Sequence, residues 1–236
     1  MIDLHSHILP GIDDGARTYE DSVTLVRELS LQGVTKMVAT PHYVDESIYT
    51  SPRARNLELI EELSARLGEA GVAMELTLGN EIYINGRILE LIAAGEISSM
   101  ADSEYVLVEL PMSGDYPNYE EILRALIRAG RKVILAHPER YESFQKDFAL
   151  IEELFDMGVL LQSNIGSITG QYGKAAQKTM KNLAKRKMVF GFGTDIHHPH
   201  GESWVMDAKK KLRKYYSDAE LEEVLVGGPS KIFLGS

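Results

Sequence analysis

The first residues of the chain include side chains that could bind a metal ion. His5 and His7 stand one residue apart in the stretch LHSHILPGIDDG, and Asp13 and Asp14 follow them. Alternate residues of a β-strand point to the same side, so His5 and His7 could contact one ion together. Two adjacent acids before a glycine are also ordinary turn chemistry, so the residues alone leave the choice between Asp13 and Asp14 open.

Similar side chains recur along the chain, each at the end of a β-rich run. A single histidine in such a place is more often a hydrogen-bonded structural residue than a ligand. Glu81 and Glu109 are stronger candidates, because each closes a mostly apolar run, where an unpaired carboxylate is costly to bury and a metal ion would compensate. The strand-end residues are His5 and His7, His42 in ATPHY, Glu81 in LGNEIY, Glu109 in VELP, His137 and Arg140 in AHPERY, and Asp195 and His197 in GTDIHH.

The elements that position these residues alternate between short β-rich runs and longer runs of helical periodicity. This order predicts a parallel sheet of seven βα units, which can close into a barrel. The carboxyl ends of the strands then gather on the face where the active sites of barrel enzymes lie. We predict strands at 2–5, 34–40, 73–79, 105–110, 133–136, 159–163 and 188–193, helices at 19–32, 55–69, 86–94, 118–129, 147–157, 173–187, 203–215 and 218–226, and the longest loops at 8–18, 43–54, 111–117 and 164–172.

Two further sequence features have a structural interpretation. GFGTD contains a Gly-x-Gly but lacks the rest of a dinucleotide fingerprint, so we interpret it as close packing at a strand end. KKKLRKYY near the C-terminus is typical of a solvated helix face rather than a binding patch. All seven histidines lie outside the predicted helices, which scattered surface residues would not do.

Composition limits the classes of protein to consider. The chain has 236 residues, 44% of them hydrophobic, which suits a single domain over 1–236. It has no cysteine, so thiolate metal sites and cysteine nucleophiles are excluded. A net charge of −10 disfavours nucleic acid as a partner. Neither a signal peptide nor a membrane span is evident in the sequence, so we expect a cytoplasmic protein without membrane insertion.

The motifs HSHILPGIDDG, ATPHY, LGNEIY, AHPERY and TDIH resemble those of the polymerase-and-histidinol-phosphatase (PHP) superfamily. Within it, the chain is similar to the manganese-dependent bacterial protein-tyrosine phosphatases of capsule and exopolysaccharide tyrosine kinases. The resemblance runs in order from His5 to His197. It implies a distorted TIM-like (β/α)7 barrel, the PHP fold, with three divalent metal ions, manganese being favoured over iron, cobalt or zinc. The implied ligands are His5, His7, Asp14, His42, Glu81, Glu109, His137, Asp195 and His197.

The resemblance also implies how such a site works. It selects Asp14 over Asp13, identifies Arg140 as the phosphate-binding arginine, and adds Asp14 and His137 to the catalytic residues. The expected reaction is attack on phosphorus by a metal-bridging hydroxide. The implied substrate is the phosphorylated tail of a tyrosine autokinase that controls polysaccharide export. After His197 the sequence departs from the family pattern, because no arginine occurs before Arg213.

Three alternatives remain open from the sequence. One is a phosphatase of a small metabolite such as histidinol phosphate, against which the opening motif argues. Another is a metal-dependent nuclease, which the acidic composition disfavours. The last is a metal-stabilised regulatory protein without catalysis, because nine ligands could saturate two ions. The sequence does not indicate the oligomeric state.

Overall fold

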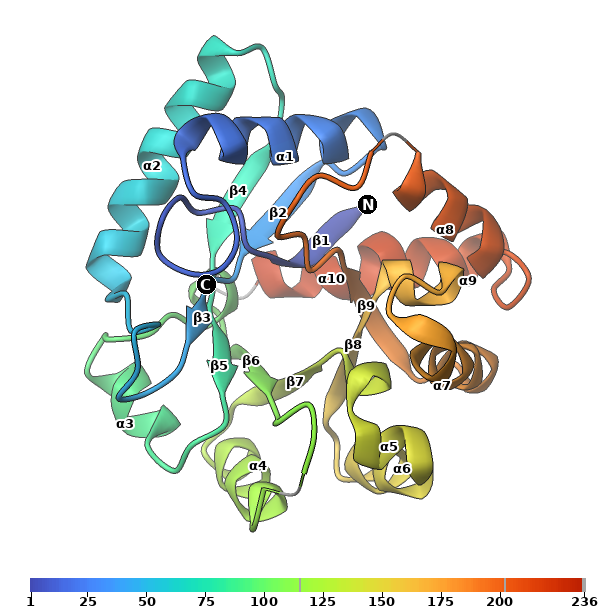
Figure 1. Cartoon of the computed structure of the whole chain (residues 1–236). Coiled ribbons are helices and arrows are strands. Elements are labelled where there is room, and N and C mark those ends of the chain that lie inside the picture. The colour runs from blue at the N-terminus through green and yellow to red at the C-terminus, as the bar shows by residue number, and fades with distance from the viewer. Residues whose placement is uncertain (115, 202, 235–236) are drawn as a thin grey trace.

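The computed structural model describes residues 1–114, 116–201 and 203–234 and arranges parallel strands in a ring with helices outside it (Figure 1). Asp115, within the predicted loop 111–117, lies outside these residues, and a single domain over 1–236 stays a prediction. The strands are β1 (Ile2–Ser6), β2 (Lys36–Ala39), β3 (His42–Tyr43), β4 (Glu75–Leu78), β5 (Glu81–Tyr83), β6 (Tyr105–Glu109), β7 (Lys132–Ala136), β8 (Leu160–Asn164) and β9 (Val189–Gly193).

Helices follow most strands and cover the outside of the ring. The α-helices are α1 (Tyr19–Leu31), α2 (Arg53–Glu69), α3 (Ile88–Ala93), α4 (Tyr119–Arg128), α5 (Glu142–Lys146), α6 (Ala149–Asp156), α7 (Gly173–Arg186), α8 (Trp204–Leu212), α9 (Asp218–Glu222) and α10 (Gly228–Ser230). Short 3-10 turns are η1 (Met100–Asp102), η2 (Pro138–Arg140), η3 (Ile165–Thr169) and η5 (Lys231–Phe233), and η4 (Glu223–Gly227) is a π-helical turn. Within the described residues, no helix combines the length and apolar character needed to cross a bilayer.

The seven predicted strand positions are confirmed, and the end of the last strand lies beside the first strand. The strand pairings among the described residues are parallel, with β1, β2 and β4 in one sheet and β3, β5, β6, β7, β8 and β9 in the other. The chain after β9 lies beside β1, since Asp195 N donates to His5 O at 2.7 Å and His7 N donates to Ile196 O at 3.1 Å. These bonds join the two sheets into a distorted barrel, as the sequence predicts.

Two barrel strands are interrupted, which the sequence analysis did not predict. β2 stops before Pro41, which lacks an N–H donor, and β3 resumes at His42. In the neighbouring strand β4 stops before Gly79, and β5 resumes at Glu81. The side chain of Asn80 bridges the break, because its Nδ2 donates to Pro41 O at 3.0 Å. Both resumed segments begin with a predicted ligand, so the breaks orient His42 and Glu81.

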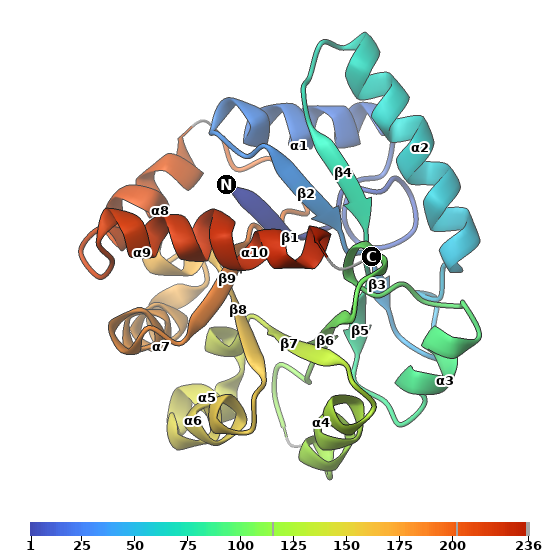
Figure 2. The same cartoon turned by 180° about the vertical axis from the view of Figure 1, so that it is seen from behind.

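The amino end of the barrel is filled by apolar side chains and closed by the C-terminal segment. Leu4, Val38, Leu107 and Ile134 form a buried cluster there with Ile232. Figure 2 shows the helical segment from α9 to α10 running across this end of the ring. Glycines permit the close approach: a Cβ on Gly191 would lie 2.6 Å from Leu4 Cδ1, and one on Gly228 would lie 2.8 Å from Phe190 O.

Two predictions need correction, and one short helix was not predicted. The helix predicted at 147–157 is confirmed as α6, near whose start the Asp147 carboxylate accepts from Ala149 N, whereas the short helix α5 before it was not predicted. The helix predicted to end at 226 continues through η4, α10 and η5 to residue 233. This extension buries the apolar side chain of Ile232 in the barrel. The predicted loop 164–172 contains the 3-10 turn η3.

Candidate metal centre

Glu81 is the hub of a buried polar cluster at the carboxyl ends of the strands. Its Oε2 atom lies 2.9 Å from His42 Nδ1, 3.1 Å from His5 Nε2 and 3.3 Å from His7 Nε2. Its Oε1 atom lies 2.9 Å from His137 Nε2. Four imidazoles from three separate barrel strands therefore surround one carboxylate that is 1% exposed.

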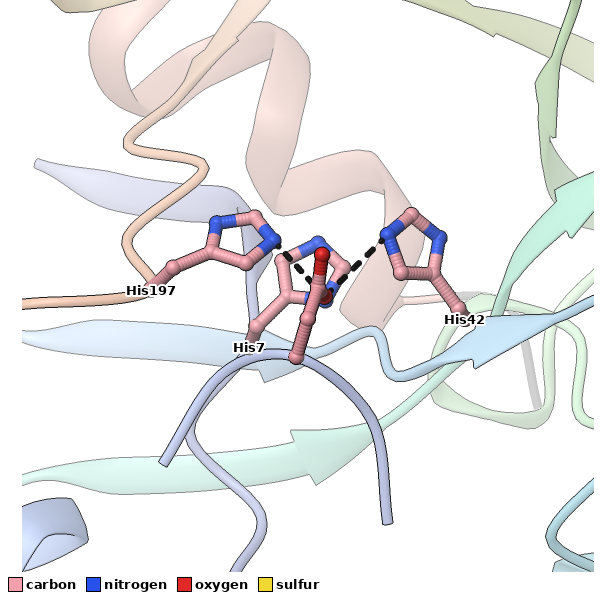
Figure 3. A group of neighbouring side chains, drawn as sticks. His7, His42 and His197 are labelled. Atoms are coloured by element: carbon pink, nitrogen blue, oxygen red, sulfur yellow. Dashed lines mark ion pairs between the residues drawn. The ribbon is translucent and has the colours of Figure 1, made fainter. Parts of the chain in front are cut away.

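A second group of ligand atoms lies at the outer edge of this cluster. Asp14 Oδ1 is 3.1 Å from His197 Nε2 and 3.5 Å from His42 Nε2, and the His7 ring stacks on His197 with centroids 4.0 Å apart. Figure 3 shows the rings of His7, His42 and His197 turned toward one another from separate segments of the chain. Asp14 is half exposed, so this group opens to solvent.

The two remaining carboxylates complete the set. Glu109 lies 3.8 Å from both His42 Nδ1 and His137 Nε2, and Asp195 Oδ1 lies 3.5 Å from His7 Nε2 and 3.6 Å from His5 Nε2. All nine predicted ligands thus form one connected cluster. Three sets of ligand atoms in it lie close enough to share an ion: His5 with His7 and Glu81, His7 with Asp14, His42 and His197, and His42 with Glu81 and Glu109.

These residues fit divalent ions on two observations. Imidazole nitrogens and carboxylate oxygens bind such ions at roughly 2.0–2.2 Å, so ligands of one ion lie about 3–4 Å apart, as they do here. Within the described residues, His42 Nδ1, Glu81 Oε2 and His137 Nδ1 are buried without a well-formed hydrogen bond. Buried polar atoms are almost always hydrogen-bonded, so three orphans in one cluster indicate ligands rather than a structural network.

Charge in the cluster shifts the pKa of its members in opposite directions. Burial alone would raise the pKa of Asp195, but the charges of His5 and His137 lower it to about 2. Burial and the neighbouring Glu81 raise the pKa of Glu109 to about 8. Burial would lower the pKa of His5, but Glu81 and Asp195 raise it to about 9. Imidazolium–carboxylate pairs therefore hold the charges that divalent ions would otherwise neutralise.

Backbone strain occurs at two predicted ligands that end strands. His137 has a φ of 32° and Asp195 a φ of 53°, both in the left-handed region that residues other than glycine rarely adopt. Such conformations cost roughly 1–3 kcal/mol each and persist at functional sites because the surrounding structure enforces them. Tyr141 helps to hold this region, since its hydroxyl donates to Ala136 O at 2.8 Å and accepts from Leu110 N.

Several residues position the candidate ligands, a role that the sequence analysis did not assign to them. Asp13 is buried, lies 2.8 Å from His7 Nδ1 and accepts from the His42 and Gly15 amides, so it does more than form a turn. Gln162 Oε1 lies 2.9 Å from His5 Nδ1. Asn164 Nδ2 donates to Asp195 Oδ2 at 2.7 Å. Gln162 and Asn164 alternate on β8 as His5, on β1, and His7, directly after it, do, and this alternation was the available signal.

Gly193 confirms the interpretation of GFGTD as close packing, because a Cβ there would lie 2.4 Å from the Cβ of His5. Arg140 reaches the same end of the barrel from η2. Its guanidinium pairs with Asp195 Oδ2 and lies over the Tyr172 ring, 4.7 Å from the centroid. The side chain is 27% exposed, so one positive charge is fixed beside the cluster and in contact with solvent.

A ring of parallel strands with a histidine- and carboxylate-rich site at its carboxyl ends defines a TIM-like α/β barrel protein with a candidate metal centre. The phosphotriesterase of Mycobacterium tuberculosis shares this fold at 14% identity and a TM-score of 0.58, covering 98% of this chain and 93% of that one. The family model described as capsular polysaccharide synthesis, CpsB/CapC, matches residues 1–234. The chain belongs to this family.

Individual relatives agree with this assignment. The tyrosine-protein phosphatase YwqE of Bacillus subtilis is 31% identical over 199 residues, which is 84% of this chain and 78% of that protein. The tyrosine-protein phosphatase CpsB of Streptococcus pneumoniae is 28% identical over 99% of this chain and 98% of its own length. A crystal structure from work on these two proteins, described as unique metal-dependent tyrosine phosphatases, matches with a TM-score of 0.93 and 26% identity, covering 100% and 96% of the chains. The resemblance inferred from the motifs is confirmed.

Proposed function

We propose that this chain is a metal-dependent protein-tyrosine phosphatase. Its family membership and the names of its relatives support this activity. The observation that carries the proposal is the convergence of nine imidazole and carboxylate side chains into one cluster, in which some buried atoms make no well-formed hydrogen bond. The absence of cysteine favours hydrolysis without the cysteinyl-phosphate intermediate that a thiol nucleophile would form.

The residues that would hold the ions are the nine described above, and we propose three divalent ions, with manganese favoured. When bound, such ions supply Lewis-acid charge and lower the pKa of bound water. The four carboxylates among the ligands would leave three ions with a surplus of positive charge. An acidic protein could then attract a phosphate dianion without a basic surface around the site.

Arg140 would bind the phosphate group. A guanidinium can donate two parallel hydrogen bonds to phosphate oxygens, and here it is already held by Asp195 and the Tyr172 ring. Asp14 lies at the solvent-exposed edge of the cluster, where a reacting group would enter, and His137 lies at its buried side. A tyrosine leaving group has a pKa of about 10, so it needs less protonation than an alkyl alcohol.

The substrate we propose is a phosphotyrosine protein, specifically the tyrosine autokinase of capsule or exopolysaccharide synthesis. Membership of a capsular polysaccharide synthesis family supports this choice. Comparing rates on phosphotyrosine peptides with rates on histidinol phosphate tests the substrate class. Faster hydrolysis of histidinol phosphate would favour the small-metabolite alternative instead.

Two measurements test the proposal. Removing metal with a chelator should abolish phosphotyrosine hydrolysis, and adding manganese should restore it. Full activity of the stripped protein would refute the metal-dependent mechanism. Arg140→Ala should lower turnover on phosphotyrosine while metal content per chain stays the same, with Arg140→Lys as the charge-retaining comparison. Loss of bound metal in Arg140→Ala would show that the arginine has a structural role.

A further inference from the structure

Positive charge is concentrated in one part of this acidic chain. Residues 174–214 contain 11 of the 25 lysines and arginines but 3 of the 35 acids. This segment has eight more positive than negative charges, whereas the rest of the chain has eighteen more negative than positive. The segment includes α7 and α8, which lie on the same side of the barrel (Figure 1).

The positive side chains line a cleft between these elements. A cavity of about 530 Å³ is lined by Thr169, Trp204, Asp207, Lys210, Lys211 and Lys214. A second cavity of about 210 Å³ shares Lys211 and Lys214 and adds Lys181 from α7. We call the two together the basic cleft. Among the described residues of its lining, four lysines face one acid, Asp207.

The lysines of the basic cleft have no acidic partners in the described part of the chain. Neighbouring cations do: Arg186 pairs with Glu152, Lys187 with Glu220 and Arg213 with Asp218. No carboxylate of residues 1–114, 116–201 or 203–234 forms an ion pair with Lys181, Lys210, Lys211 or Lys214. Clustered like charges without counter-ions destabilise a surface, so an external anion would relieve their repulsion.

The mouth of the basic cleft adjoins the candidate metal centre. Thr169 ends η3, which begins directly after Asn164, a hydrogen-bond donor to Asp195. Trp204 begins α8, and its ring lies 5.3 Å from the ring of His200, three residues after His197. The His200 ring contacts Gln171 at 2.9 Å, which links the two walls. The cleft therefore starts at the rim of the barrel that carries the site.

We propose that the basic cleft binds an acidic segment of the protein substrate, next to the phosphotyrosine that enters the metal centre. The inference rests on the proposed phosphatase function. A concave cleft with an aromatic side chain at its mouth fits an extended peptide better than the flat surface of a membrane. On this proposal the stretch KKKLRKYY would be a binding surface as well as a solvated helix face, because Lys210, Lys211 and Lys214 belong to it and line the cleft.

The test compares two substrate peptides on three proteins. One peptide carries phosphotyrosine beside a run of glutamates, and the other has glutamine in place of each glutamate. Each peptide is made in two versions, one with the run before the tyrosine and one with the run after it. The proteins are the wild type, a cleft variant (Lys210→Gln, Lys211→Gln, Lys214→Gln) and a control (Arg55→Gln, Arg124→Gln, Lys146→Gln). The control removes three exposed cations from α2, α4 and α5, so both variants change the net charge equally.

We expect the wild type to have a KM for the better glutamate peptide lower by on the order of tenfold than for its glutamine match at low salt. The cleft variant should lose most of this difference, while the control should keep it. Turnover of p-nitrophenyl phosphate, which is too small to reach the cleft, should be equal in all three proteins. Equal KM values for both peptides in the wild type, or an equal loss in the control, would overturn the proposal.

A binding measurement separates this proposal from the proposed function. Fluorescence anisotropy of an unphosphorylated glutamate peptide requires no hydrolysis, and binding should weaken in the cleft variant alone. If this holds but no phosphotyrosine peptide is hydrolysed, the phosphatase function fails and the anion-binding cleft stands. If the cleft instead binds phosphatidylserine vesicles and no acidic peptide, the surface serves a membrane and our proposal is wrong.

Discussion

The two ends of the barrel are built from the same strands but bury different chemistry. At the amino end, Leu4, Leu107 and Ile232 pack in an apolar cluster. At the carboxyl end, the same strands present imidazoles and carboxylates, two of them on strained backbone, and some of their buried atoms make no well-formed hydrogen bond. Burying such groups costs stability that apolar packing must offset. The comparison indicates that apolar packing is concentrated at one end and the candidate metal centre at the other.

Glu81→Gln should have the largest effect and should leave the fold intact. It removes the charge that four imidazoles surround, so bound metal should be lost and phosphatase activity should fall by more than the roughly 100-fold that outer positioning substitutions cost. Metal analysis measures the loss of bound metal at the carboxyl end, and circular dichroism measures whether the fold stays intact. Glu75→Gln is the matched control, since Glu75 lies in the same barrel strand, in β4, and its side chain is 51% exposed. Equal losses of bound metal and activity in Glu81→Gln and Glu75→Gln would contradict the contrast between the two ends of the barrel.

Ile232→Ala should lower stability and leave activity intact, which is the reverse of the effect expected for Glu81→Gln. Ile232 is fully buried at the amino end, so the truncation should lower the free energy of unfolding by about 2–5 kcal/mol. Urea denaturation measures this change, and activity per folded molecule should stay near that of the wild type. Leu234→Ala, at a side chain 79% exposed, should change stability little. A loss of metal affinity in Ile232→Ala would show that the two ends are coupled.

Asp13→Asn should have a smaller effect, restricted to the carboxyl end. The Asp13 carboxylate contacts Nδ1 of His7 and so orients this ring. Residues that orient a metal ligand in this way typically contribute 10–100-fold in metal affinity. Titration of stripped protein with manganese measures the change. An affinity equal to that of the wild type would mean that Asp13 acts only as a turn residue.

The smallest expected effect is a pH dependence of the metal-free protein. The pKa of His5 is raised from 6.5 to about 9, so its stabilisation is complete below pH 6.5 and lost as pH rises through 9. The pKa of Glu109 is raised from 4.5 to about 8, so its contribution is lost in the same direction. The Tm of stripped protein should therefore fall by a few degrees between pH 6.5 and 9. Metal affinity should rise over that range because ligands lose protons.

Most of the candidate ligands could be proposed from the sequence because each lies at the end of an apolar strand, where a polar side chain is conspicuous. Asp14 was selected over Asp13 only by the family resemblance, because both lie in a loop. The roles of Asp13 and Gln162 could not be proposed, since they depend on His7 and His5 being oriented by a particular loop and a distant strand. The breaks before His42 and Glu81 were also missed, because Pro41 and Gly79 resemble ordinary strand ends. The basic cleft depends on α7 and α8 lying together, which no single helix reveals.

The contacts between β1 and the chain that follows β9 join residues from opposite ends of the sequence. Asp3 accepts hydrogen bonds from Thr194, 191 residues later, and Asp195 N donates to His5 O. During synthesis, the first histidines leave the ribosome long before the strand that completes their site. Uptake of a divalent ion by a nascent chain should therefore coincide with the last step of folding, which would make the candidate metal centre a natural reporter of a finished barrel.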